Sequence, residues 1–134
     1  MKQLIAFALV GVLCAACQET LEEKAAKEAE LYTKKNCPAK IAENITMDSL
    51  TFELPTHTLH YYYTLSGIID SIGLLTPETA RSSLLKELRN TTSMLGYKEA
   101  GYRFAYTYRS QKAPDTVLFD MVFTEKDYNG KEPE

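Results

Sequence analysis

The sequence predicts an α+β domain made of two αββ units, with a four-stranded antiparallel sheet covered by helices on one face. Apolar residues recur at helical spacing over residues 20–36 and 76–95. They alternate with polar residues over residues 46–66, and again over residues 102–109 and 117–123. The expected order is therefore helix, strand, strand, helix, strand, strand. We place the N-terminal helix within residues 17–36, the α+β domain at residues 37–125 and a polar tail at residues 126–134.

The first helix is predicted from its start signal and its composition. Thr20 and Glu23 have the spacing of a capping box, and strong helix formers follow. Its apolar stripe is thin, and contains Leu21, Ala25, Ala29 and Tyr32. Pro38 cannot continue the hydrogen-bond ladder, so the helix is expected to end just before it.

The first hairpin is predicted from a change to a period of two residues. Leu50, Phe52 and Leu54 share one face of its first strand, and residues 55–58 form the turn. The inward residues of its second strand are Leu59, Tyr61, Tyr63 and Leu65. Residues 67–75 are read as an apolar connector that either extends this strand or loops back.

The second helix has the clearest pattern in the chain. Thr76 is the expected N-cap and Pro77 occupies the first helical position. Leu84, Leu88 and Leu95 recur at helical spacing, and Gly96 is the expected stop. A second hairpin follows, and the chain is expected to fray from Glu125 onward.

The N-terminus has the features of a secretory signal peptide. Lys2 gives a positive start, and residues 4–13 form an apolar run too short for a spanning helix. The run is followed by Cys14-Ala15-Ala16-Cys17, which resembles the lipobox of bacterial lipoproteins. The alternative is ordinary cleavage after Ala16, which would leave Cys17 unmodified.

The lipobox resemblance implies removal of residues 1–16 and attachment of acyl chains, such as palmitate, to Cys17. Gln18, in place of Asp, resembles the pattern that sends lipoproteins to the outer membrane. The mature domain resembles, in pattern alone, uncharacterised small envelope lipoproteins. Cys37 would then be the remaining thiol, either as a reactive group or as a buried apolar side chain.

Charge argues against a general electrostatic nucleic-acid site. The chain has 15 basic and 18 acidic residues, a formal charge of −3, which becomes −4 when the leader and Lys2 are removed. Basic residues concentrate in residues 81–112 and acidic ones in residues 113–134. One sheet face therefore offers a candidate surface for a ligand or partner, with a solvated sheet face as the alternative. Its candidate residues are His60, Tyr62, Arg103 and Arg109.

Aromatic residues give a second candidate site. The chain has nine tyrosines and no tryptophan. Five tyrosines share the predicted inward face, namely Tyr61, Tyr63, Tyr102, Tyr106 and Tyr108. They indicate either an aromatic cleft for a glycan, a peptide or a small apolar ligand, or simply the hydrophobic core.

Catalytic and metal-binding patterns are not found in the sequence. His57 and His60 flank a predicted turn with no third ligand nearby, and no nucleophile elbow or phosphate loop occurs. A hydrolase would require His60 to meet a carboxylate or a serine in a cleft. We therefore expect neither an enzyme nor a metal or cofactor.

The sequence thus favours a lipid-anchored protein of the cell envelope, with a small domain that binds a protein or a glycan. The membrane is expected as a partner through the N-terminal lipid. The alternative is an inhibitor or immunity-type protein that caps a hydrolase or toxin through a hairpin tip, at residues 55–58 or 112–115.

Overall fold

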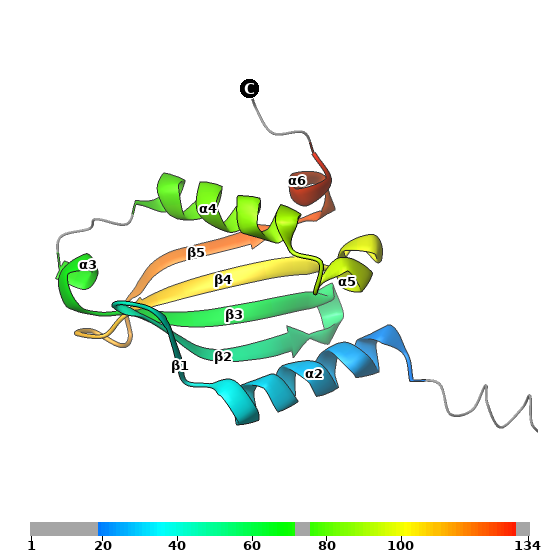
Figure 1. Cartoon of the computed structure of the whole chain (residues 1–134), viewed down its shortest axis with the longest axis horizontal. Coiled ribbons are helices and arrows are strands. Elements are labelled where there is room, and N and C mark those ends of the chain that lie inside the picture. The colour runs from blue at the N-terminus through cyan, green and yellow to red at the C-terminus, as the bar shows by residue number, and fades with distance from the viewer. Residues whose placement is uncertain (1–18, 72–75, 131–134) are drawn as a thin grey trace, which may run out of the picture.

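A computed structural model describes residues 19–71 and 76–130. Its strands form one mixed sheet in the order β1-β2-β3-β4-β5 (Figure 1). They are β1 (Ala39–Ala42), β2 (Ile45–Glu53), β3 (Thr58–Leu65), β4 (Arg103–Ser110) and β5 (Val117–Phe123). The α+β class and both predicted hairpins, β2–β3 and β4–β5, are confirmed. The four-stranded antiparallel sheet is corrected in two respects, because β1 adds a strand and the central pair β3–β4 is parallel.

The parallel pair follows from the connection between the two hairpins. After β3 the chain passes through α3 (Gly67–Ser71), α4 (Pro77–Asn90) and α5 (Leu95–Glu99) before it enters β4. This crossover returns the chain to the end of the sheet where β3 begins, so β4 runs in the same direction as β3. The alternation of apolar residues predicts each hairpin but not the direction in which two hairpins join.

The two long helices lie on the same face of the sheet, near opposite edges (Figure 1). They are α2 (Leu21–Asn36), which packs against β2, and α4, which packs against β5. Both begin as predicted. The Thr20 hydroxyl accepts the Glu23 N–H at 3.1 Å, and the Thr76 hydroxyl accepts the Thr79 N–H at 3.2 Å.

Helix α4 ends at Asn90, earlier than the expected stop at Gly96. The Lys98 ammonium donates to the carbonyls of Leu88 and Thr91 at 2.8 and 2.7 Å. These bonds satisfy the end of the helix, where a positive charge is also favourable. Gly96 lies inside α5 instead. Leu95, the last residue of the predicted stripe, is 50% exposed, so its helical spacing does not mark a buried position.

The chain after Glu125 forms α6 (Glu125–Asn129) where a frayed tail was expected. The Asp127 carboxylate accepts the Thr124 N–H at 2.8 Å, which completes a capping box. The buried Tyr128 hydroxyl donates to the carbonyl of Tyr102 at 2.9 Å. The helix is therefore fixed to the domain at both ends. Residues 131–134 of the expected tail lie outside the described residues.

The predicted leader and Cys17 also lie outside the described residues. Within the described ranges, no helix combines the length and the hydropathy that a bilayer span requires.

Helix α2 completes the edge of the sheet at a single residue. Strand β1 pairs with β2 only as far as Met47, so the outer edge of β2 is open at Leu50. The Thr33 hydroxyl accepts the Leu50 N–H and donates to the Leu50 carbonyl, both at 2.9 Å. One side chain thus satisfies two backbone groups that would otherwise be left unpaired under the helix.

We predict that Thr33→Val lowers the free energy of unfolding by about 2 kcal/mol, because it leaves both Leu50 groups without a partner. Urea unfolding measures the change. The control is Thr51→Val, at an exposed position of β2, which should shift the free energy by less than about 0.5 kcal/mol. Equal losses in the two variants would contradict the role of Thr33.

Candidate functional site

The parallel pairing of β3 with β4 sets tyrosines side by side in a regular array. Tyr61 lies opposite Tyr106 and Tyr63 opposite Tyr108. The ring centroids of these pairs are 5.0 and 4.8 Å apart, with interplanar angles of 9° and 15°. All four rings stand on the face that carries the helices. The β3–β4 register therefore produces an aromatic platform on this face.

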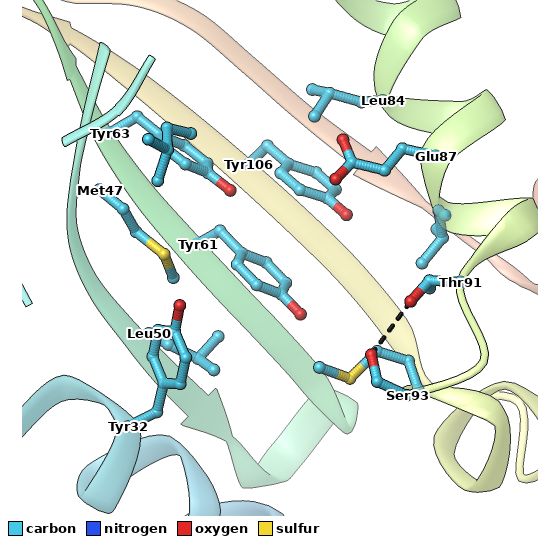
Figure 2. Close-up of a pocket in the computed structure, with 13 residues that line it drawn as sticks. Tyr32, Met47, Leu50, Tyr61, Tyr63, Leu84, Glu87, Thr91, Ser93 and Tyr106 are labelled. Carbon is cyan, nitrogen blue, oxygen red and sulfur yellow. Dashed lines mark hydrogen bonds between the residues drawn. The ribbon is translucent and has the colours of Figure 1, made fainter. Parts of the chain in front are cut away.

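A groove runs above this platform between α2 and α4. Tyr61, Tyr63 and Tyr106 form its floor, and the cavity volume is about 360 Å³ (Figure 2). Its walls include Tyr32 of α2, Leu84 and Glu87 of α4, and the chain after α4. The complete lining is Tyr32, Ile41, Met47, Leu50, Tyr61, Tyr63, Leu84, Glu87, Leu88, Thr91, Ser93, Met94 and Tyr106.

A second cavity of about 460 Å³ continues the groove toward α5. The two cavities share Tyr32, Leu50, Ser93 and Met94. Lys35 of α2 and Tyr97 of α5 lie along this second part. Together the cavities form one groove, mostly apolar, that follows the space between the helices.

The phenols of the floor remain neutral over a wide pH range. Burial is the main cause that raises the pKa of Tyr61, Tyr63 and Tyr106 well above the usual value of 10. The negative charge of Glu87 adds to each of these shifts. Among the described residues, no protein group hydrogen-bonds these three hydroxyls. The groove therefore has an apolar floor with unused hydroxyl groups.

The structure separates the five tyrosines of the predicted cleft. Tyr61, Tyr63 and Tyr106 line the groove, whereas Tyr108 packs beside Tyr63. Tyr102 lies at one end of the sheet, where its ring stacks with His57 at 5.0 Å and Phe52 at 5.7 Å. It is 2% exposed and belongs to the core. Three of the five predicted tyrosines thus line a groove, and their rings also belong to or pack against the core.

The predicted partner face is the opposite face of the sheet, and His60 occupies its centre. Its Nδ1 lies 2.7 Å from the Glu53 carboxylate, and its Nε2 lies 2.7 Å from the Thr107 hydroxyl. Thr107 in turn donates to Asp120 at 3.0 Å. The Tyr62 ring stacks on His60 with centroids 4.1 Å apart. These contacts link β2, β3, β4 and β5.

The two arginines of this face lie apart from the histidine cluster. Arg103 is exposed at the start of β4. Arg109, six residues further along the same strand, donates to the Pro114 carbonyl at 3.4 Å. A separation of six residues on a strand is about 20 Å. The four predicted residues thus share a face without forming one compact site.

His60 meets a carboxylate, as a hydrolase would require, but the remaining geometry does not suit catalysis. Its second partner is the Thr107 hydroxyl, which is on a residue only 4% exposed and donates a hydrogen bond to Asp120. His60 also lies on the face opposite the groove, so it cannot act on a molecule bound there. We interpret the cluster as a network that holds four strands together.

The two other titratable candidates, Cys37 and His57, contact neighbouring parts of the domain. Cys37 is half-buried, and burial followed by the charge of Asp48 raises the pKa of its thiol, which disfavours the reactive thiolate. His57 contacts the Glu22 carboxylate at 3.5 Å. In the described part of the chain, no group of three or more His, Cys, Asp or Glu side chains is arranged to hold a metal ion.

The two hairpin tips of the inhibitor hypothesis lie at opposite ends of the sheet (Figure 1). The β2–β3 turn contains a short 3₁₀ helix (Leu54–Thr56), and Leu54 is 58% exposed there. Leu54 therefore does not share the inward face that alternation predicted. The β4–β5 loop closes through the Thr116 N–H and the Ala113 carbonyl at 2.8 Å.

Several wall residues of the groove escaped the sequence analysis, above all Glu87, Ser93 and Met94. Glu87 follows Leu84 by three residues, so it borders the apolar stripe of α4. The position of Glu87 beside this stripe could therefore have been recognised in the sequence. The space between α2 and α4, which makes Glu87 a lining residue of the groove, cannot be predicted from local spacing.

We predict that the free energy of unfolding decreases as the pH rises from about 10 to 12. The unfolded chain loses tyrosine protons near pH 10, whereas the folded protein retains them, because burial raises the pKa values and brings that of Tyr108 to about 12. Denaturant unfolding at several pH values measures the slope. The double variant Tyr63→Phe, Tyr106→Phe should show a shallower decrease, and parallel curves would contradict the assignment.

Comparison with known proteins places the chain in a family. A family described as "Domain of unknown function (DUF8479)" matches residues 20–119. No curated protein sequence matches the chain significantly.

Solved structures share the fold. A type II secretion system pilotin from Vibrio vulnificus, EpsS, superposes with a TM-score of 0.66 at 11% identity, over 85% of this chain and 94% of that one. The pilotin AspS from Vibrio cholerae gives 0.62 at 14% identity, over 80% and 91%. A Pseudomonas aeruginosa protein described as secreted gives 0.64 at 17% identity, over 83% and 99%. The chain shares its fold with these proteins, and by the match over residues 20–119 it belongs to the DUF8479 family.

Proposed function

We propose that this protein is a lipid-anchored binding protein of the bacterial cell envelope, and that its groove receives a helical segment of a partner protein. The observation that carries the proposal is the open groove between α2 and α4 above the tyrosine floor. The proposed activity is binding, not catalysis.

The opening between the helices favours a helix as the occupant. Helix α2 packs on β2 and α4 on β5, so three strand intervals, about 14 Å, separate the strands beneath them, more than the 8–10 Å between helices in direct contact. In the described part of the chain, no helix runs along β3 between them (Figure 1). A partner helix would lay its apolar face in this opening, on Tyr61, Tyr63 and Tyr106.

The proteins of known structure that share this fold support an envelope location and a protein partner. Two of them are pilotins of type II secretion systems, and one is described as secreted. We propose that the partner is a component of an envelope assembly, such as a secretion apparatus. The predicted signal peptide and the lipobox-like sequence before Cys17 support the same location, and Gln18 supports the outer membrane.

The position of α2 would hold the domain close to the bilayer. Leu21, the first residue of α2, follows Cys17 by four residues, which span at most about 14 Å when extended. A partner bound in the groove would then be kept near the membrane surface by the anchor.

We predict that p-benzoylphenylalanine in place of Tyr32 crosslinks to one segment of one partner in intact envelopes. Tyr32 is 40% exposed and lines both cavities, so the probe replaces one aromatic ring with another in the groove. Irradiation, followed by mass spectrometry of the adduct, identifies the segment. Adding Ser93→Trp, which fills the groove from an exposed position, should abolish the adduct.

Matched probes separate the competing surfaces. In one matched variant p-benzoylphenylalanine replaces Tyr62, on the opposite face of the sheet. In another it replaces Leu54, at the β2–β3 tip. An adduct formed from Tyr62 but not Tyr32 would overturn the groove proposal. An adduct formed only from Leu54 would favour an inhibitor that acts through its hairpin tip.

We predict that Cys17→Ser moves the protein from the membrane fraction to the soluble fraction. Acyl chains on Cys17 would supply the attachment, at roughly 0.8 kcal/mol per buried methylene. Fractionation without detergent measures the distribution, and Cys37→Ser is the control. Retention of the Cys17→Ser protein on membranes would contradict the lipid anchor.

A further inference from the structure

Glu87 occupies a position that the stability of its own helix does not explain. It lies in the last turn of α4, where a negative charge opposes the helix dipole. On α2, by contrast, Glu30 pairs with Lys34 at 2.9 Å and Glu28 lies 3.9 Å from Lys24. Among the described residues Glu87 has no such partner. Its neighbours one turn away on α4 are uncharged.

The surroundings of Glu87 would suit a positively charged group. It is the one charged side chain among the described residues that line the first cavity. Figure 2 shows it reaching from α4 toward Tyr106. The hydroxyls of Tyr61, Tyr63 and Tyr106 also lack partners in the described residues, and each oxygen can accept a hydrogen bond. The first cavity therefore presents a carboxylate and three phenols, and none of the described residues that line it is cationic.

We propose that the helix bound in the groove carries an arginine or lysine on its apolar face, and that Glu87 and the tyrosine hydroxyls bind its head group. The proposal rests on the proposed function of the groove. The aliphatic stem of such a residue packs on the tyrosine edges while its nitrogens donate to Glu87. A carboxylate at the same position would be repelled by Glu87. The contact thus selects one kind of helix and fixes its register.

The wall that α2 contributes carries both signs of charge. Lys35 and Glu28 both line the second cavity. Glu28 accepts the Tyr97 hydroxyl at 2.5 Å and lies 3.9 Å from Lys24, whereas within the described ranges Lys35 has no ion-pair partner. An acidic residue of the bound helix that faces α2 would therefore pair with Lys35.

The test uses a defined probe, a phage library of 14-residue amphipathic helices randomised at the centre of the apolar face. Peptides selected on the wild-type protein should be enriched in Arg or Lys at one central position. Their affinity should fall about tenfold in Glu87→Gln and remain unchanged in Glu78→Gln, an exposed control on the same helix. Glu87→Lys should select Asp or Glu at that position.

The outcomes distinguish this inference from the proposed function. Peptides that lose binding in Ser93→Trp but show no basic enrichment, or bind Glu87→Gln equally well, would overturn the role of Glu87 alone. A library that yields no peptide sensitive to Ser93→Trp would overturn the groove as a helix site. A concentration-dependent dimer abolished by Ser93→Trp would assign the groove to a second copy of the chain.

Discussion

The parallel pairing of β3 with β4 is the constraint on which the rest of the structure depends. A parallel pair requires a crossover, and here the crossover supplies α4 and places it over β5. The same pairing brings Tyr61 opposite Tyr106 and thereby builds the aromatic floor. Helix α2 is fixed independently at the other edge through Thr33 and Leu50. The two helices therefore lie apart, and the groove is a consequence of how the sheet is assembled.

The helix layer covers the sheet incompletely, and the groove residues show how this exposure is tolerated. Tyrosine combines a large apolar ring with a hydroxyl that remains in contact with water. Tyr63 and Tyr106 are 7% and 6% exposed, and their hydroxyl oxygens are not fully buried, so the floor belongs to the core and still offers polar atoms. A floor of leucine at these positions would expose an apolar patch of the kind that promotes association. A tyrosine floor therefore suits a groove that is exposed to water when no partner is bound.

Much of the fold could be predicted from local patterns. The caps at Thr20 and Thr76, both hairpins and the inward face of β3 follow from period and turn chemistry. The parallel direction of β4 and the added strand β1 could not be read, because both depend on contacts between distant segments. The tyrosines of the groove were recognised as candidates, yet Tyr102 looked equivalent to them by parity alone. Glu87 became meaningful only once α4 was placed beside the tyrosine floor.

We propose that the occupant of the groove lies between α2 and α4 on the tyrosine floor. The methyl groups of three methionines test this position of the occupant. Met47 and Met94 line the groove, whereas Met121 of β5 does not. Selective ¹³C-methyl NMR during titration with the crosslinked partner segment measures the chemical shifts of all three methyl groups. We expect large chemical-shift changes for Met47 and Met94 and little change for Met121. Saturable binding that leaves Met47 and Met94 unshifted would contradict it.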